Sequence, residues 1–170
     1  MCIMCNNQWD WPFIPNKRIS KQEKGIKFIS QNQWPNTRYD LEKNELTGCF
    51  ECCIASILGL EAGSVPFFET EEDVNNNDNY SWYNRFKDWC SKNNYELSIY
   101  CPDNIFFPKD DYYILTCDVK NHSGFMSSHS VIGYNGNIVF DPSPSPYRDD
   151  QFVKFCDIFF LKPKKIGKNL

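Results

Sequence analysis

Cys49 and His129 are the residues whose types and positions offer nucleophilic chemistry. Cys49 opens an apolar run with only two polar residues up to Leu58, which predicts a buried helix over residues 49–58 that begins at this cysteine. The start of a helix carries partial positive charge and free N–H groups, which favour a thiolate and can hold an oxyanion. His129 is a candidate base, and Asp141 is a candidate for fixing its tautomer, in the chain order Cys, His, Asp.

The hairpin between His129 and Asp141 provides a test of this hypothesis. Asn135-Gly136 is a strong signal for a tight turn between two strands. A simple two-residue loop pairs 134 with 137 and 130 with 141, which places the imidazole and the carboxylate on opposite faces. The Cys-His-Asp hypothesis therefore requires either a three-residue loop, Tyr134 to Gly136, or a bulge.

The other cysteines and the second histidine suit plainer roles. A buried cysteine that packs as a small hydrophobic residue is the usual case, and Cys52 and Cys53 are predicted to be core residues of this kind. His122 is predicted to lie in a surface loop. The Cys2-x-x-Cys5 and Cys49-x-x-Cys52 pairs are too far apart, and the second lies within an apolar helix, so no metal site is expected and no cofactor is implied.

Size and composition restrict the class of protein. A chain of 170 residues with a net charge of −4 fits one domain and lacks a basic stripe for a nucleic-acid partner. Nine scattered cysteines favour a reducing compartment. The N-terminus shows neither the basic start nor the apolar segment of a signal peptide, and no run is long enough to cross a membrane. We therefore expect a cytoplasmic protein of the producing or infected cell, with no membrane partner.

The order of the predicted elements indicates an α+β domain. Ile26–Ile29 is a candidate short strand, and helices are predicted over 49–58 and 81–93, the second with an aromatic stripe. Antiparallel strands are predicted at 96–101, 112–119, 128–134, 137–141 and 152–161. We divide the chain into an aromatic and proline-rich arm packed on the domain (1–45), a domain (46–162) and a basic tail (163–170). Residues 69–79 are predicted to form an acidic loop that shapes entry to the site.

Three separated blocks of sequence resemble one known family. They are residues 48–60 with Val65-Pro-Phe67, then His129-Ser-Val-Ile-Gly133, and finally Val139-Phe-Asp-Pro-Ser-Pro144, with a Trp-bearing helix between the first two. The pattern resembles the small papain-like cysteine proteases of bacteria and phages, which are distantly similar to bacteriocin-processing peptidases. The resemblance covers roughly residues 46–161.

This resemblance implies a papain-like fold in which the nucleophile helix packs on an antiparallel sheet. It assigns Cys49 as the nucleophile, His129 as the base and Asp141 as the residue that orients the base. In the family an upstream glutamine completes the oxyanion hole. The candidates for that role here are Gln31, Gln33 and Asn44.

The expected function is that of a thiol protease, a cysteine hydrolase that cleaves a peptide or isopeptide bond of a protein substrate through a thioester. Two alternatives stay open. One is a transglutaminase-like acyltransferase on the same scaffold. The other is a catalytically silent phage or bacterial binding protein that sequesters a host partner.

Overall fold

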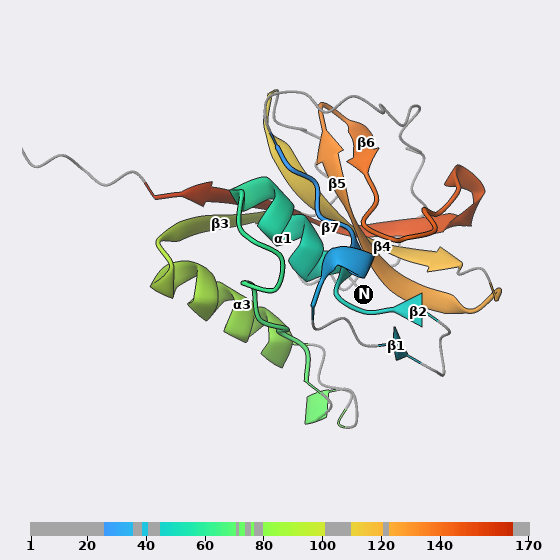
Figure 1. The fold of residues 1–170 in the computed structure, drawn as a ribbon, viewed down its shortest axis with the longest axis horizontal. Coiled ribbons are helices and arrows are strands. Elements are labelled where there is room, and N and C mark those ends of the chain that lie inside the picture. Colours follow the sequence, from blue (N-terminus) through green and yellow to red (C-terminus); the bar gives the residue numbers. More distant parts are fainter. Residues whose placement is uncertain are drawn as a thin grey trace, which may run out of the picture.

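The computed structural model describes residues 26–35, 39–40, 45–70, 72–73, 76, 80–100, 110–120 and 123–164. Within them, two helices pack on a five-stranded antiparallel sheet, an α+β arrangement (Figure 1). Most of the predicted 1–45 arm and of the 163–170 tail lies outside the described residues. No helix among the described residues reaches the length and apolarity of a membrane span.

The elements follow the predicted order, with helices before the main sheet. The bounds are 3-10 helix η1 Gln31–Gln33, β1 Tyr39–Asp40, β2 Glu45–Leu46, α1 Cys49–Leu58, α3 Ser81–Lys92, β3 Tyr95–Tyr100, β4 Tyr112–Lys120, β5 Met126–Tyr134, β6 Asn137–Phe140, 3-10 helix η2 Asp149–Gln151 and β7 Phe152–Pro163. β1 and β2 form a separate two-stranded pair. The main sheet has the order β3-β7-β4-β5-β6, so β5, which carries His129, lies between β4 and the edge strand β6.

The core between the helices and the sheet is largely aromatic. Phe50 of α1 makes edge-to-face contacts with Phe86 of α3 and Phe159 of β7, at ring-centroid distances of 5.0 and 5.3 Å. Phe86 and Cys90, part of the predicted aromatic stripe of α3, are buried, which confirms that the stripe faces the core. Alternate strand positions, such as Leu115 on β4, belong to a second buried cluster on the other face of the sheet. These contacts hold α1 against both the sheet and α3.

The predicted strand at Ile26–Ile29 is wrong. These residues have no regular secondary structure, and the segment instead runs beside α1, where the Ile29 N–H donates to Ser56 Oγ at 2.8 Å. Phe28 stacks on Phe140 of β6 at a centroid distance of 4.6 Å. The segment therefore connects α1 with the edge strand β6 through side chains and not through a strand ladder.

Candidate catalytic site

Cys49 is the first residue of α1, as the sequence predicts. Gly48 precedes it with a φ of +93°, and the Gly48 carbonyl accepts the first backbone bond of the helix from the Cys52 N–H at 3.0 Å. A Cβ at Gly48 would lie only 3.2 Å from Phe67 Cε1. The left-handed backbone and the crowding by Phe67 together require glycine here. The result is a partly exposed free thiol at the positive end of a helix.

The hairpin that carries His129 and Asp141 combines a tight turn with a bulge. The turn is the two-residue one, with Asn135 and Gly136 at φ of +48° and +78° and with Tyr134 paired to Asn137. The register then shifts, so that Ile132 pairs with Phe140 and not with residue 139. One extra residue in β6 reverses the side-chain alternation beyond it. Of the two geometries left open by the sequence, the bulge is therefore the observed one, and the three-residue loop is wrong.

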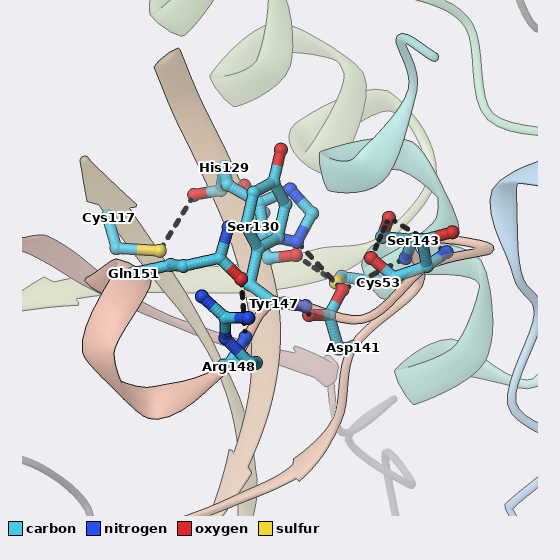
Figure 2. Close-up of polar contacts among 10 residues, drawn as sticks. Cys53, Cys117, His129, Ser130, Asp141, Ser143, Tyr147, Arg148 and Gln151 are labelled. Atoms are coloured by element: carbon cyan, nitrogen blue, oxygen red, sulfur yellow. Dashed lines mark hydrogen bonds and ion pairs between the residues drawn. The ribbon is translucent and has the colours of Figure 1, made fainter. Parts of the chain in front are cut away.

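The bulge brings the His129 ring and the Asp141 carboxylate into direct contact. His129 Nε2 and Asp141 Oδ1 are 2.8 Å apart, and both residues are buried (Figure 2). Because an ionised carboxylate only accepts hydrogen bonds, Nε2 is the protonated nitrogen that donates to it. The Asp141 carboxylate also accepts the Ser143 N–H on Oδ1 at 2.9 Å and the Tyr147 N–H on Oδ2 at 2.8 Å. The turn that follows the strand thus fixes the carboxylate.

The charges of the site favour a protonated imidazole. Burial opposes the charge on His129, but the charge of the neighbouring Cys49 and the carboxylate of Asp141 raise the pKa of His129 to about 10. Burial also opposes the charge on Asp141, yet the hydrogen bonds from His129 and from the Ser143 and Tyr147 backbone hold the pKa of Asp141 below its ordinary value. Since Nε2 binds Asp141, Nδ1 is the ring nitrogen left for Cys49. The arrangement can stabilise a thiolate–imidazolium pair.

Tyr147 is a site residue that the sequence reasoning missed. Its ring lies against the His129 ring at a centroid distance of 4.7 Å and is buried, so it covers the imidazole on one side (Figure 2). Its backbone N–H is one of the donors to Asp141. The available signal was the alternation of serine and proline from Pro142 to Pro146, which indicates a stiff turn that returns the chain to the site.

The three candidates for the oxyanion hole differ in where the structure places them. Gln31 is buried at 2 % exposure, and its N–H donates to the carbonyl of Pro142, the residue after Asp141, at 2.8 Å. Gln33 is exposed, and its side chain accepts the Ser30 N–H at 3.0 Å in a local cap. Asn44 lies outside the described residues. Gln31 is therefore the candidate that the fold brings to the end of the hairpin that carries Asp141.

Cys52 and Cys53 are completely buried, in agreement with their predicted place in the core. Burial raises the pKa of both thiols above the ordinary range, so neither is a ready thiolate. The Cys53 thiol donates to the Ser130 carbonyl of β5 at a distance of 3.6 Å, and the Cys117 thiol donates to the His129 carbonyl at 3.4 Å (Figure 2). These contacts attach the helix and β4 to the strand that carries the imidazole.

Glu51, in the first turn of α1, is a buried carboxyl that the sequence analysis treated only as a polar helix position. Its Oε1 accepts the Phe68 N–H at 3.4 Å, and the Phe68 carbonyl accepts Arg85 Nε of α3 at 2.7 Å. Burial raises the pKa of Glu51 to about 7. The contacts hold the segment after α1, which includes Phe67, against the start of α1.

Several predicted features cannot be placed. Cys2, Cys5 and His122 lie outside the described residues, and so does about half of the predicted acidic loop 69–79. In its described part, Asp73 forms an ion pair with Arg85, which connects the loop to α3. Among the described residues, no group of three potential metal ligands lies together.

Comparisons with models of protein families, with curated proteins and with solved structures find no match to this chain.

Proposed function

We propose that the chain is a papain-like cysteine hydrolase that cleaves a peptide or isopeptide bond through a thioester. The observation that supports this most is the alignment of three groups. Cys49 stands at a helix start and raises the pKa of His129, which binds Asp141 at 2.8 Å. Acyl transfer to a thiol requires a nucleophile, a neighbouring base and a group that orients the base.

In the proposed reaction, the Cys49 thiolate attacks the carbonyl carbon of the scissile bond. Negative charge then develops on the carbonyl oxygen, where N–H groups at the start of α1 and the side-chain amide of Gln31 are the proposed donors. The His129 imidazolium gives its proton to the leaving amine, which leaves a thioester on Cys49. His129 then accepts a proton from water while the water oxygen attacks the thioester, which releases the acid and restores the Cys49 thiolate and the His129 imidazolium.

An activated ester tests this function without knowledge of the natural substrate. With p-nitrophenyl acetate, the proposal predicts a burst of nitrophenolate close to one equivalent, an acetyl group on Cys49 by peptide mapping, and slow turnover as water deacylates the enzyme. Cys49→Ala should abolish the burst, whereas Cys90→Ala, which removes a buried thiol in α3, should retain it. A chain that is not acetylated at Cys49 refutes the proposal.

Two further measurements distinguish a hydrolase from an acyltransferase and identify the oxyanion donor. Added glycinamide should leave turnover unchanged in a hydrolase, and an acceleration with formation of N-acetylglycinamide would show an acyltransferase instead. Gln31→Ala should slow acylation by about 100-fold if its amide stabilises the oxyanion. Gln33→Ala is the matched control and should acylate as the parent does, because its side chain is exposed.

A further inference from the structure

The first turn of α1 contains two cysteines in very different environments. Cys49 is partly exposed at the helix start, and Cys52, three residues later, is completely buried. In a regular helix, Cα atoms three residues apart are separated by about 5 Å, and disulfides join Cα atoms that are roughly 4.4–6.8 Å apart. The backbone therefore holds the pair at disulfide distance.

We propose that Cys49 is a reversible oxidation site, at which a hydroperoxide converts the thiolate to a sulfenic acid and Cys52 then closes a Cys49–Cys52 disulfide. The proposal concerns the regulation of the proposed catalytic site and depends on the proposed function for the thiolate at Cys49. The disulfide would block the nucleophile and protect it from irreversible oxidation.

The chemistry balances with the peroxide as the only oxidant. The Cys49 thiolate attacks one peroxide oxygen, the O–O bond breaks, and the departing hydroxide takes the proton of the His129 imidazolium to become water. The Cys52 sulfur then displaces the hydroxyl of the sulfenic acid, and the Cys52 thiol proton leaves with it as a second water. In total, two thiols and one hydrogen peroxide give one disulfide and two waters, and a dithiol such as dithiothreitol reverses the change.

The structure favours Cys52 over Cys53 as the partner. The Cys53 thiol is engaged with the Ser130 carbonyl on β5, so it would have to break that contact and turn towards the helix start. Within the described part of the chain, the Cys52 thiol makes no hydrogen bond of this kind. The first turn of a helix is also where the backbone is least restrained, so side chains there can adjust to disulfide geometry.

Burial determines the order of the two steps. Cys52 is 0 % exposed, so a peroxide in solution reaches only Cys49, and Cys52 reacts with what has already formed there. A partly exposed thiolate beside a buried resolving cysteine is the arrangement found in redox-sensitive sites.

The test uses the full chain, reduced and then treated with hydrogen peroxide. After remaining thiols are blocked with N-ethylmaleimide, peptides are prepared without reduction, and fragment ions locate the link. We expect a Cys49–Cys52 disulfide that dithiothreitol reduces, with full recovery of labelling at Cys49. Cys53→Ala should behave as the parent does. Cys52→Ala should progress to sulfinic acid at Cys49, which dithiothreitol does not reverse.

Sulfinic acid forming on the parent as fast as on Cys52→Ala, or a link from Cys49 to Cys53, would overturn the proposal. Fragment mapping of the parent chain decides this even if the Cys52→Ala chain does not fold. The readout requires no turnover, so it fails separately from the proposed function. A disulfide without ester acylation would refute only the hydrolase, and acylation without a disulfide would refute only the oxidation site.

Discussion

Replacing Asp141 by asparagine or by alanine separates its role in orienting His129 from its role in the turn that follows β6. The carboxylate accepts three hydrogen bonds, from His129 Nε2 and from the backbone N–H groups of Ser143 and Tyr147. Asparagine has one acceptor oxygen. If that oxygen faces His129 and Ser143, the amide NH₂ must face the Tyr147 N–H, so that two donors meet in a buried site.

The structure gives different magnitudes for the two substitutions. In Asp141→Asn one buried donor loses its acceptor, which should lower the free energy of unfolding by about 1–3 kcal/mol. In Asp141→Ala all three bonds are lost and the imidazolium loses its buried partner, for which we expect about 3–5 kcal/mol. The asparagine oxygen still holds the ring, so the alkylation rate of Cys49 should fall modestly. In the alanine variant it should fall by about 100-fold.

Two measurements on the same preparations check this prediction. Urea denaturation gives the change in unfolding free energy, and the iodoacetamide rate at Cys49, followed by peptide mapping, reports the orientation of His129. Asp111→Asn is the control, since the exposed ion pair between Asp111 and Lys162 should contribute less than about 1 kcal/mol to the free energy of unfolding. Equal alkylation rates in Asp141→Ala and the parent, in chains that are folded, would refute the orienting role.

Three other variants probe the surroundings of Cys49. Glu51 has an ordinary pKa of 4.5 and a raised pKa of about 7 in the folded chain, so between these pH values the folded chain holds a proton that the unfolded chain has lost. The free energy of unfolding should therefore fall as pH rises through this window, and Glu51→Gln should remove up to about 3 kcal/mol of that fall. Urea denaturation at several pH values measures this, and a Glu51→Gln profile identical to that of the parent would contradict the proposed effect of burial. Gly48→Ala should lower the free energy of unfolding by about 1–2 kcal/mol because of its left-handed backbone, and it should also slow alkylation of Cys49 because the new Cβ crowds Phe67. Gly59, at the other end of α1, also has a positive φ, but a Cβ added there would meet no atom within 4 Å, so Gly59→Ala should lower stability alone. Equal alkylation rates in the two variants would count against the Phe67 contact. Tyr147→Ala should lower the free energy of unfolding by about 3–5 kcal/mol and slow alkylation of Cys49, whereas Tyr147→Phe should keep the alkylation rate of the parent. If Tyr147→Ala is alkylated at Cys49 as fast as the parent, the Tyr147 ring does not position the imidazole.

The helix and the hairpin turn were predictable because local signals determine them. The apolar run from Cys49 and the glycines on either side of it define α1, and Asn135-Gly136 specifies the turn. The bulge was not predictable in the same way. It depends on packing, since Phe140 stacks on Phe28, a residue more than one hundred positions earlier in the chain. The sequence supplied only the condition that a bulge or a longer loop had to exist.

The parts of the site that were missed come from tertiary contacts. Ile26–Ile29 has the composition of a strand, but the Ile29 N–H is taken by a side chain of α1. Tyr147 reaches His129 because a proline-rich turn returns the chain to the site, and neither its destination nor the burial of Glu51 is encoded in periodicity. Among the oxyanion candidates, only the fold distinguishes Gln31 from Gln33.

The most direct test of the central claim is the rate at which iodoacetamide labels each cysteine of the native chain near neutral pH. The thiolate–imidazolium arrangement predicts that Cys49 is labelled well before the other five described cysteines, all of which are buried. It also predicts that His129→Ala slows labelling at Cys49 strongly, in a chain that urea denaturation shows to be folded. If Cys49 reacts no faster than a free thiol in an unfolded peptide, or if His129→Ala leaves its rate unchanged, the catalytic assignment is contradicted.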